Sequence, residues 1–158
     1  MKRLTSIIIL FLSLTLAFSQ QVSLKEYTNK EGVTAVTISK NMLSLFPKGA
    51  DITYGGINVG EFVDKLSAIN VFASRKEEVA AQLIDDATKF LEMSGFERLI
   101  SMETEKAEHL NFFIQSNEQY ISEFVLILQG QDKESAVMQF TGKFTMEDIQ
   151  QMIASANK

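Results

Sequence analysis

The sequence predicts an α+β fold. We expect a single domain with one curved, mostly antiparallel sheet of about five to six strands. A long amphipathic helix and a C-terminal helix are expected to pack on a face of this sheet. The part from residue 97 to residue 144 holds four strand-like stretches separated by turn-rich breaks, which favours a four-strand meander. Two other segments repeat apolar residues at helical spacing instead.

The N-terminus has the pattern of an export signal. The basic start Met1-Lys2-Arg3 precedes an apolar run that extends to Phe18. This run is shorter than the apolar stretch that a membrane-spanning helix requires. Small residues at Ala17 and Ser19 predict cleavage near Ser19-Gln20. We therefore expect a signal peptide at 1–19, an N-terminal lead-in at 20–32 for which disorder is an open alternative, and one α+β domain at 33–158. The expected location is periplasmic or secreted, without a stable membrane anchor; a retained N-terminal anchor is the alternative.

Composition narrows the classes of function. The precursor has a net charge of -5, and removal of Lys2 and Arg3 would bring it to -7. Such a charge, without a basic run, argues against nucleic acid or anionic lipid as a partner. The sequence has no cysteine, which excludes a thiol nucleophile, a disulfide, a Cys-ligated metal and lipidation at an N-terminal Cys. We expect no cofactor.

The first half of the domain alternates short elements with turns. Residues 33–39 are rich in β-branched side chains and predict a strand, after which Ser39 is placed to cap a short helix that Pro47 ends. The glycine-rich segment from Lys48 to Gly60 is expected to be a loop. Asn58 is placed to cap another short helix, and a strand is expected near 68–73.

Two helices are predicted with defined ends. Ser74-Arg75-Lys76-Glu77 has the form of a capping box before a long apolar stripe, and Gly95 is placed to end that helix. Thr145-Met146-Glu147-Asp148 has the same capping-box form at the start of the C-terminal helix.

The strand patterns suggest a candidate interaction surface. Residues 120–129 are apolar on both faces, as in a central strand covered on both sides. If helices cover only one face of the sheet, however, the apolar side chains of the opposite face form an exposed patch that needs a partner. We expect this surface to comprise Phe113, Val125, Ile127 and Val137, with Tyr54 contributed by the glycine-rich loop.

One acidic cluster resembles a metal or acid–base site. It comprises Glu103, Glu105, Glu108 and His109, and His109 is the only histidine in the chain. A metal site would need several converging ligands, and Lys106 lies in the middle of the cluster. We therefore favour a solvated hairpin edge, where charge discourages strand-to-strand aggregation, and expect no metal. A small hydrolase that uses Glu103 or Glu105 with His109 remains the alternative.

Three segments resemble a known family. They are Gly32 to Lys40 with the following Leu43 and Phe46, Leu66 to Ser74, and Gly142 to Ile149. Together they resemble the exported Bacteroidota family called domain of unknown function 4252. The resemblance implies an exported envelope protein, and the frequent proximity of family genes to extracytoplasmic-function sigma factors implies a role in envelope stress or surface adaptation. It implies no catalytic residue.

The expected function is therefore binding without catalysis. Surplus apolar residues on the sheet favour a non-enzymatic domain that engages an envelope protein. A carrier of an apolar ligand is a second alternative, because the many Phe and Met side chains suit an adaptable apolar pocket.

Overall fold

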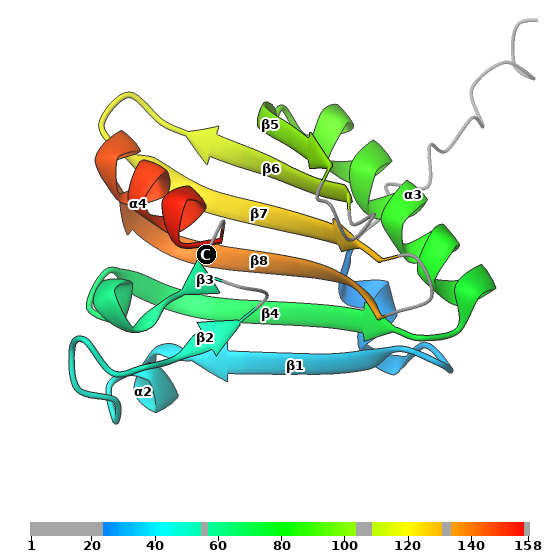
Figure 1. The fold of residues 1–158 in the computed structure, drawn as a ribbon, viewed down its shortest axis with the longest axis horizontal. Helices are drawn as coiled ribbons and strands as arrows, with labels where there is room; N and C mark the ends of the chain where they lie inside the picture. The colour runs from blue at the N-terminus through cyan, green and yellow to red at the C-terminus, as the bar shows by residue number, and fades with distance from the viewer. Residues whose placement is uncertain (1–23, 55–56, 104–108, 131–133, 157–158) are drawn as a thin grey trace, which may run out of the picture.

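The protein is an α+β domain built on one six-stranded antiparallel sheet, as the computed structural model shows (Figure 1). The structure describes residues 24–54, 57–103, 109–130 and 134–156. The strand order is β1-β4-β8-β7-β6-β5, so the last four strands form the predicted meander. These strands are β1 (Thr34–Ser39), β4 (Leu66–Ser74), β5 (Glu97–Glu103), β6 (His109–Ser116), β7 (Ile121–Gln129) and β8 (Ser135–Phe144).

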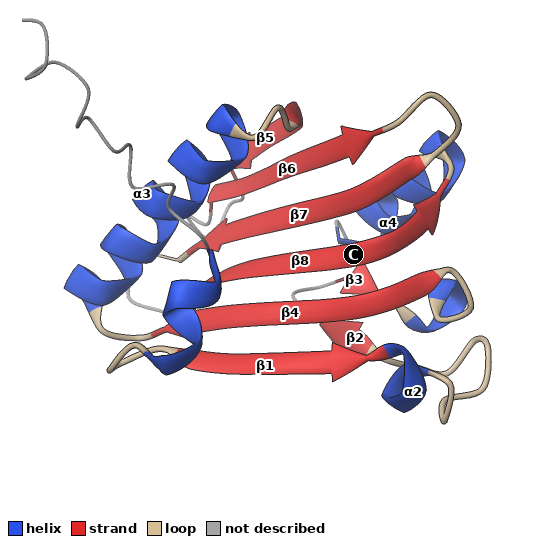
Figure 2. Cartoon of the chain, turned by 180° about the vertical axis from the view of Figure 1, so that it is seen from behind, coloured by secondary structure: helices blue, strands red, loops and turns tan. Residues whose placement is uncertain are grey.

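Helices cover both faces of the sheet. The long helix α3 (Glu77–Met93) and the 3-10 helix η1 (Leu24–Asn29) lie on one face, which we call the α3 side (Figure 2). The closing helix α4 (Met146–Ala156) packs on the other face, the α4 side. The hairpin β2 (Thr53–Tyr54) and β3 (Ile57–Asn58), the turn η2 (Gly60–Phe62) and the short helix α2 (Lys40–Leu43) complete the fold. We expected both long helices on a single face, and the structure places them on opposite faces.

The start of α3 differs from the predicted capping box. The helix begins at Glu77, and the Ser74 hydroxyl does not cap it. Instead this hydroxyl donates a hydrogen bond to the carbonyl oxygen of Gly32 at 2.8 Å and accepts one from the backbone N–H of Lys76 at 3.2 Å. Ser74 therefore ties the end of β4 to the turn before β1. The other end agrees with the sequence: Gly95 adopts a φ of 78° just after the helix, a conformation that glycine tolerates.

The start of α4 has the predicted capping box. The backbone N–H of Thr145 donates to the Asp148 carboxylate at 2.8 Å, and the N–H of Asp148 donates to the Thr145 hydroxyl at 3.2 Å. Both oxygens of the same carboxylate accept hydrogen bonds from the Lys65 ammonium, at 2.6 and 2.7 Å. Burial opposes ionisation of Asp148, but Lys65 and the Thr145 N–H outweigh it and lower the pKa of this carboxyl. The pair fastens α4 to the residue before β4.

Asp148→Asn should make stability less dependent on pH. A carboxyl with a lowered folded pKa stabilises the fold above its unfolded pKa, about 4, and this contribution is lost as the pH falls through the folded pKa. We expect the substitution to cost about 1–3 kcal/mol near neutral pH, because Lys65 loses its partner. Urea unfolding across the acid range measures this difference. It should shrink towards zero at low pH, and an undiminished difference there would show that the charge of Asp148 is not what stabilises α4.

Aromatic packing fills the centre of the α4 side. Phe112, Phe124 and Phe140 come from three neighbouring strands and are fully buried. The ring centroids of Phe112 and Phe124 lie 5.6 Å apart, and those of Phe124 and Phe140 lie 5.5 Å apart. Such offset pairs stabilise a core beyond the area that they bury. This aromatic row lies in the same core as Ile149 and Met152 of α4.

Candidate binding site

The four sheet residues of the expected interaction surface are buried. Phe113, Val125, Ile127 and Val137 are at most 1% exposed. They point to the α3 side, where they form one core with Leu83, Ala87 and Leu91 of α3 and with Leu24 and Tyr27 of η1. The sequence pattern correctly placed these four side chains on the sheet face opposite to that of their neighbours along the strands. However, α3 and η1 cover that face. The expected exposure is therefore corrected, and these residues hold the helix to the sheet.

The predicted glycine-rich loop contains the hairpin β2–β3, which lies beside α4 (Figure 1). Tyr54 is the last residue of β2 and pairs with Ile57, although its side chain is outside the described part. Asn58 does not cap η2 as predicted, because the N-cap residue is Val59 and no side chain caps the helix. The Asn58 side-chain oxygen instead accepts the N–H of Gly60, two residues further on, at 3.0 Å. At Gly60 a Cβ atom would lie 1.7 Å from the Ala50 carbonyl oxygen, so this close approach requires glycine.

Side chains on the α4 side change in size along the strands. One row across the sheet consists of Thr34, Ala73, Ala136 and Leu128, which are cross-strand neighbours. The next row contains Val36, Val71, Met138 and Leu126, and the third contains Ile38, Ile69, Phe140 and Phe124. The first row, with the small residues Ala73 and Ala136 at its centre, lies at the start of β8, whereas α4 follows the end of β8. The small side chains of Ala73 and Ala136 are therefore adjacent at the end of the sheet that α4 does not cover. This leaves a hollow on the α4 side of the sheet.

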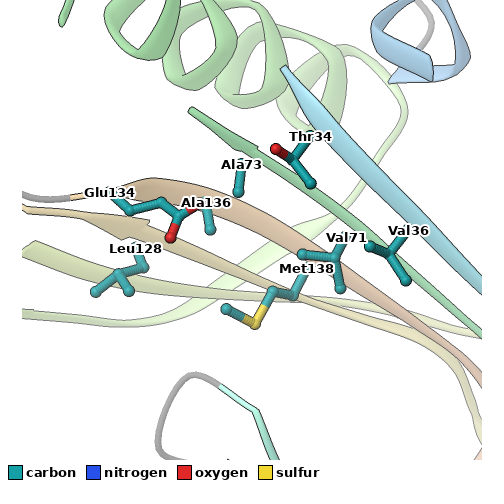
Figure 3. A pocket seen from close by; sticks show the side chains of 8 residues that line it. All are labelled: Thr34, Val36, Val71, Ala73, Leu128, Glu134, Ala136 and Met138. Atoms are coloured by element: carbon teal, nitrogen blue, oxygen red, sulfur yellow. The ribbon is translucent and has the colours of Figure 1, made fainter. Parts of the chain in front are cut away.

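A pocket occupies this hollow. It has a volume of about 260 Å³ and lies on the sheet face opposite α3 (Figure 3). Four strands contribute to its lining, so it crosses the sheet from β1 to β7. The lining is mainly aliphatic and comprises Thr34, Val36, Val71, Ala73, Leu128, Ala136 and Met138, with Glu134 as the one charged residue. A pocket of this kind excludes water from an apolar group and offers a single polar contact.

Charged residues lie at the rim of the pocket. Arg75 contacts Glu134 across 3.6 Å, and the Arg75 side chain is 82% exposed. A second, more open depression of about 460 Å³ shares Thr34 and Glu134 with the first and continues past Arg75 and Lys76. A group bound in the apolar pocket would therefore have polar and charged partners immediately outside it.

The acidic cluster is only partly within the described residues. Glu103 ends β5 and His109 begins β6, and these two residues are cross-strand partners in the hairpin register. Glu105 and Glu108 lie outside the described residues. Glu103 is exposed and His109 is half-buried. The described residues contain no group of three or more side chains placed to hold a metal ion.

Sequence reasoning missed the role of the lead-in. Disorder was an open alternative for the lead-in at 20–32, but within it η1 spans Leu24–Asn29 and packs on α3. The Tyr27 hydroxyl donates to the Asp86 carboxylate and to the Gln82 carbonyl oxygen, the latter at 3.3 Å. Burial, together with the nearby Asp86 charge, raises the pKa of Tyr27 well above its usual range. The spacing of Leu24 and Tyr27, three residues apart, was the available signal.

Comparison with known protein families gives one match. The model of the domain of unknown function DUF4252 matches residues 27–152, which is most of the chain. The chain belongs to this family. Comparison with curated proteins and with solved structures gives no match.

The match to DUF4252 covers all the described strands, the whole of α3 and the first part of α4, because it extends from Tyr27 of η1 to Met152 of α4. It therefore includes all residues that line the pocket and, apart from Leu24, the buried residues of both cores. No helix among the described residues has the length and apolar character needed to cross a membrane.

Proposed function

We propose that this DUF4252 protein is an exported envelope protein that acts by binding, and that it takes an apolar side chain of a protein partner into the pocket on the α4 side. The pocket is the observation that supports this proposal. Its aliphatic lining favours an apolar group, and its rim at Arg75 and Glu134 offers polar contacts to the backbone beside that group.

The size of the pocket favours a side chain over a larger ligand. At about 260 Å³ it lies below the range of roughly 300–1,000 Å³ that is usual for sites of small-molecule ligands. A pocket beside the edge of a sheet suits a peptide, because the neighbouring backbone offers hydrogen bonds while the pocket selects one side chain. Thr34 and Val36, which belong to the edge strand β1, line it.

Export and an envelope role are proposed on other grounds. The charged start and apolar run of the first residues support export. The link to envelope stress or to sigma-factor-associated regulation is supported by the family resemblance. A hydrolase built on Glu103 and His109 has no further support in the geometry of the described residues, and we do not propose it.

Filling the pocket should abolish binding without harming the fold. Ala136 is 4% exposed, lies between Ala73 and Leu128 on the neighbouring strands and lines the pocket, so Ala136→Leu places a larger side chain in the pocket. We expect it to change stability by less than about 2 kcal/mol, and to stabilise if the cavity accepts it without strain. N-acetyl-leucinamide, a minimal apolar side chain with a peptide backbone, is the probe. Wild type should bind it saturably, and the variant should not.

Ala68→Leu is the matched control. Ala68 is half-buried and does not line the pocket, so the same substitution there should leave binding of the probe intact. Hexanoate, which carries an alkyl chain but no peptide group, separates the two alternatives. Tighter binding of hexanoate than of N-acetyl-leucinamide would favour the carrier of an apolar ligand. Probe binding that survives Ala136→Leu would exclude this pocket as the site.

A further inference from the structure

The two edge strands of the sheet differ in how well they are protected from pairing with a strand of another chain. The edge strand β5 carries Glu97, Arg98 and Glu103, and its pairing with β6 is interrupted by an irregularity between Arg98 and Ile100. Charges and irregularities are the usual means by which an edge strand avoids pairing with another chain. The edge strand β1 has neither. Its sequence, TAVTIS, contains no charge and no proline, and all six residues pair with β4 in unbroken register.

Among the described residues, no strand pairs with the outer side of β1. The sheet order ends at β1, and in both views no described strand lies along its outer edge, while α2 lies at its C-terminal end (Figures 1 and 2). In a regular antiparallel ladder, every second residue directs its N–H and C=O away from the single neighbouring strand. The outward groups of β1 are therefore available to another strand, and its β-branched residues favour such pairing.

Charges at the two ends of β1 indicate which strand fits. Glu31 precedes the strand, and its side chain is 98% exposed, with Lys76 at the long distance of 3.8 Å. Lys40 follows the strand, and its ammonium donates to the backbone carbonyls of Asp64 and Leu66 at 3.3 and 3.0 Å. These carbonyls are neutral, so they solvate the Lys40 charge without cancelling it. The strand therefore has an acidic group at one end and a basic group at the other.

We propose that two copies of this chain pair through β1 in antiparallel orientation and form one continuous sheet. A two-fold axis places the start of each strand beside the end of its partner, so that Glu31 of each copy approaches Lys40 of the other. Parallel pairing would instead place like charges together. An identical uncharged strand also brings no repulsion into the centre of the interface.

This arrangement has a consequence for the pocket. An antiparallel pair of edge strands is related by an axis perpendicular to the sheet, so the same face of each copy lies on the same side of the joint sheet. Thr34 and Val36 of β1 line the pocket, so the two pockets would open on one face, on either side of the axis. One partner that displays two apolar side chains could then occupy both sites, which increases affinity through effective concentration.

Molar mass as a function of concentration tests the pairing. Light scattering and sedimentation should show a reversible dimer for the wild type. Thr37→Lys should shift it to the monomer, because Thr37 is exposed on β1 and each copy would bring a charge into the otherwise uncharged interface. Ser101→Lys introduces the same charge at an exposed position on the opposite edge strand and should leave the dimer unchanged. Circular dichroism and thermal unfolding confirm that both variants are folded.

A charge reversal tests the orientation. Glu31→Lys should weaken the dimer about tenfold, since each exposed ion pair contributes roughly 0.2–1 kcal/mol and the symmetric interface holds two. Combining Glu31→Lys with Lys40→Glu should restore it. A wild type that is monomeric at every concentration, or a dimer that resists Thr37→Lys, would overturn the proposal. Failure of the double substitution to restore a dimer in a folded protein would overturn the antiparallel arrangement.

Discussion

Phe124→Ala is expected to destabilise the protein by about 3–5 kcal/mol. Phe124 is fully buried in the central strand β7 and lies between the rings of Phe112 and Phe140. Truncation removes its apolar contacts and both ring pairs, and it leaves a cavity that a central strand paired on both sides cannot easily close. Because a domain has only about 5–15 kcal/mol of net stability, this loss is a large part of the total.

Phe46→Ala is the control for the aromatic row. Phe46 lies after α2 and is 41% exposed, so the same substitution there should cost less than about 1 kcal/mol. Denaturant unfolding of both variants gives the comparison. A cost for Phe124→Ala as small as that for Phe46→Ala would mean that the aromatic row does not form the centre of the core.

Val125→Asp is expected to unfold most of the protein at room temperature. Val125 is fully buried on the α3 side of β7, in the core that α3 and η1 complete. A carboxylate at this position would lose its hydration without gaining a partner, which costs several kcal/mol for a buried charge. This substitution also tests whether the α3 side of the sheet is covered or exposed. If this side were exposed, Val125→Asp would affect partner binding and leave the stability of the protein almost unchanged.

Gln129→Asp is the matched control. Gln129 lies on the same strand four residues further on, so it points to the same face, but it is exposed. The same carboxylate there should change stability by about 0.5 kcal/mol or less. Far-ultraviolet circular dichroism and urea unfolding measure both variants. A fully folded Val125→Asp protein of normal stability would contradict the covered α3 side.

Local patterns predicted most of the fold. The period of two in the last four strands is a direct consequence of side chains that alternate across a sheet, and the meander needs only short turns between them. The Thr145–Asp148 capping box and the glycine at position 95 are likewise local signals, and the structure confirms both. The family assignment is also confirmed.

The covering of each face could not be predicted, because it depends on strand order. Antiparallel pairing across β4, β8, β7, β6 and β5 makes β4 and β5 run in the same direction. The connection between them through α3 is therefore a crossover, and such crossovers are almost always right-handed. This rule selects one face for α3 only once the order is known. Helix α4 follows the last strand, has no such constraint, and covers the other face.

The pocket also depends on register. Ala73 and Ala136 are sixty-three positions apart in the sequence, and either alone is an ordinary small residue of a strand. Only the pairing of β4 with β8 places them side by side, and only the position of α4 at the other end of β8 leaves them without a helix above. A single sequence contains neither fact. The sequence suggested an exposed apolar surface, whereas the sheet residues that it indicated are buried beneath α3.

Methyl chemical shifts during titration with N-acetyl-leucinamide test the central claim most directly. The account predicts saturable shifts at the methyl groups of Val36, Val71 and Met138, which line the pocket. The methyl groups of Val125 and Ile127, buried beneath α3, should remain unchanged. Shifts confined to the α3 side, or no saturable shift at the pocket methyl groups, would contradict the claim that this protein binds an apolar side chain on the α4 side of its sheet.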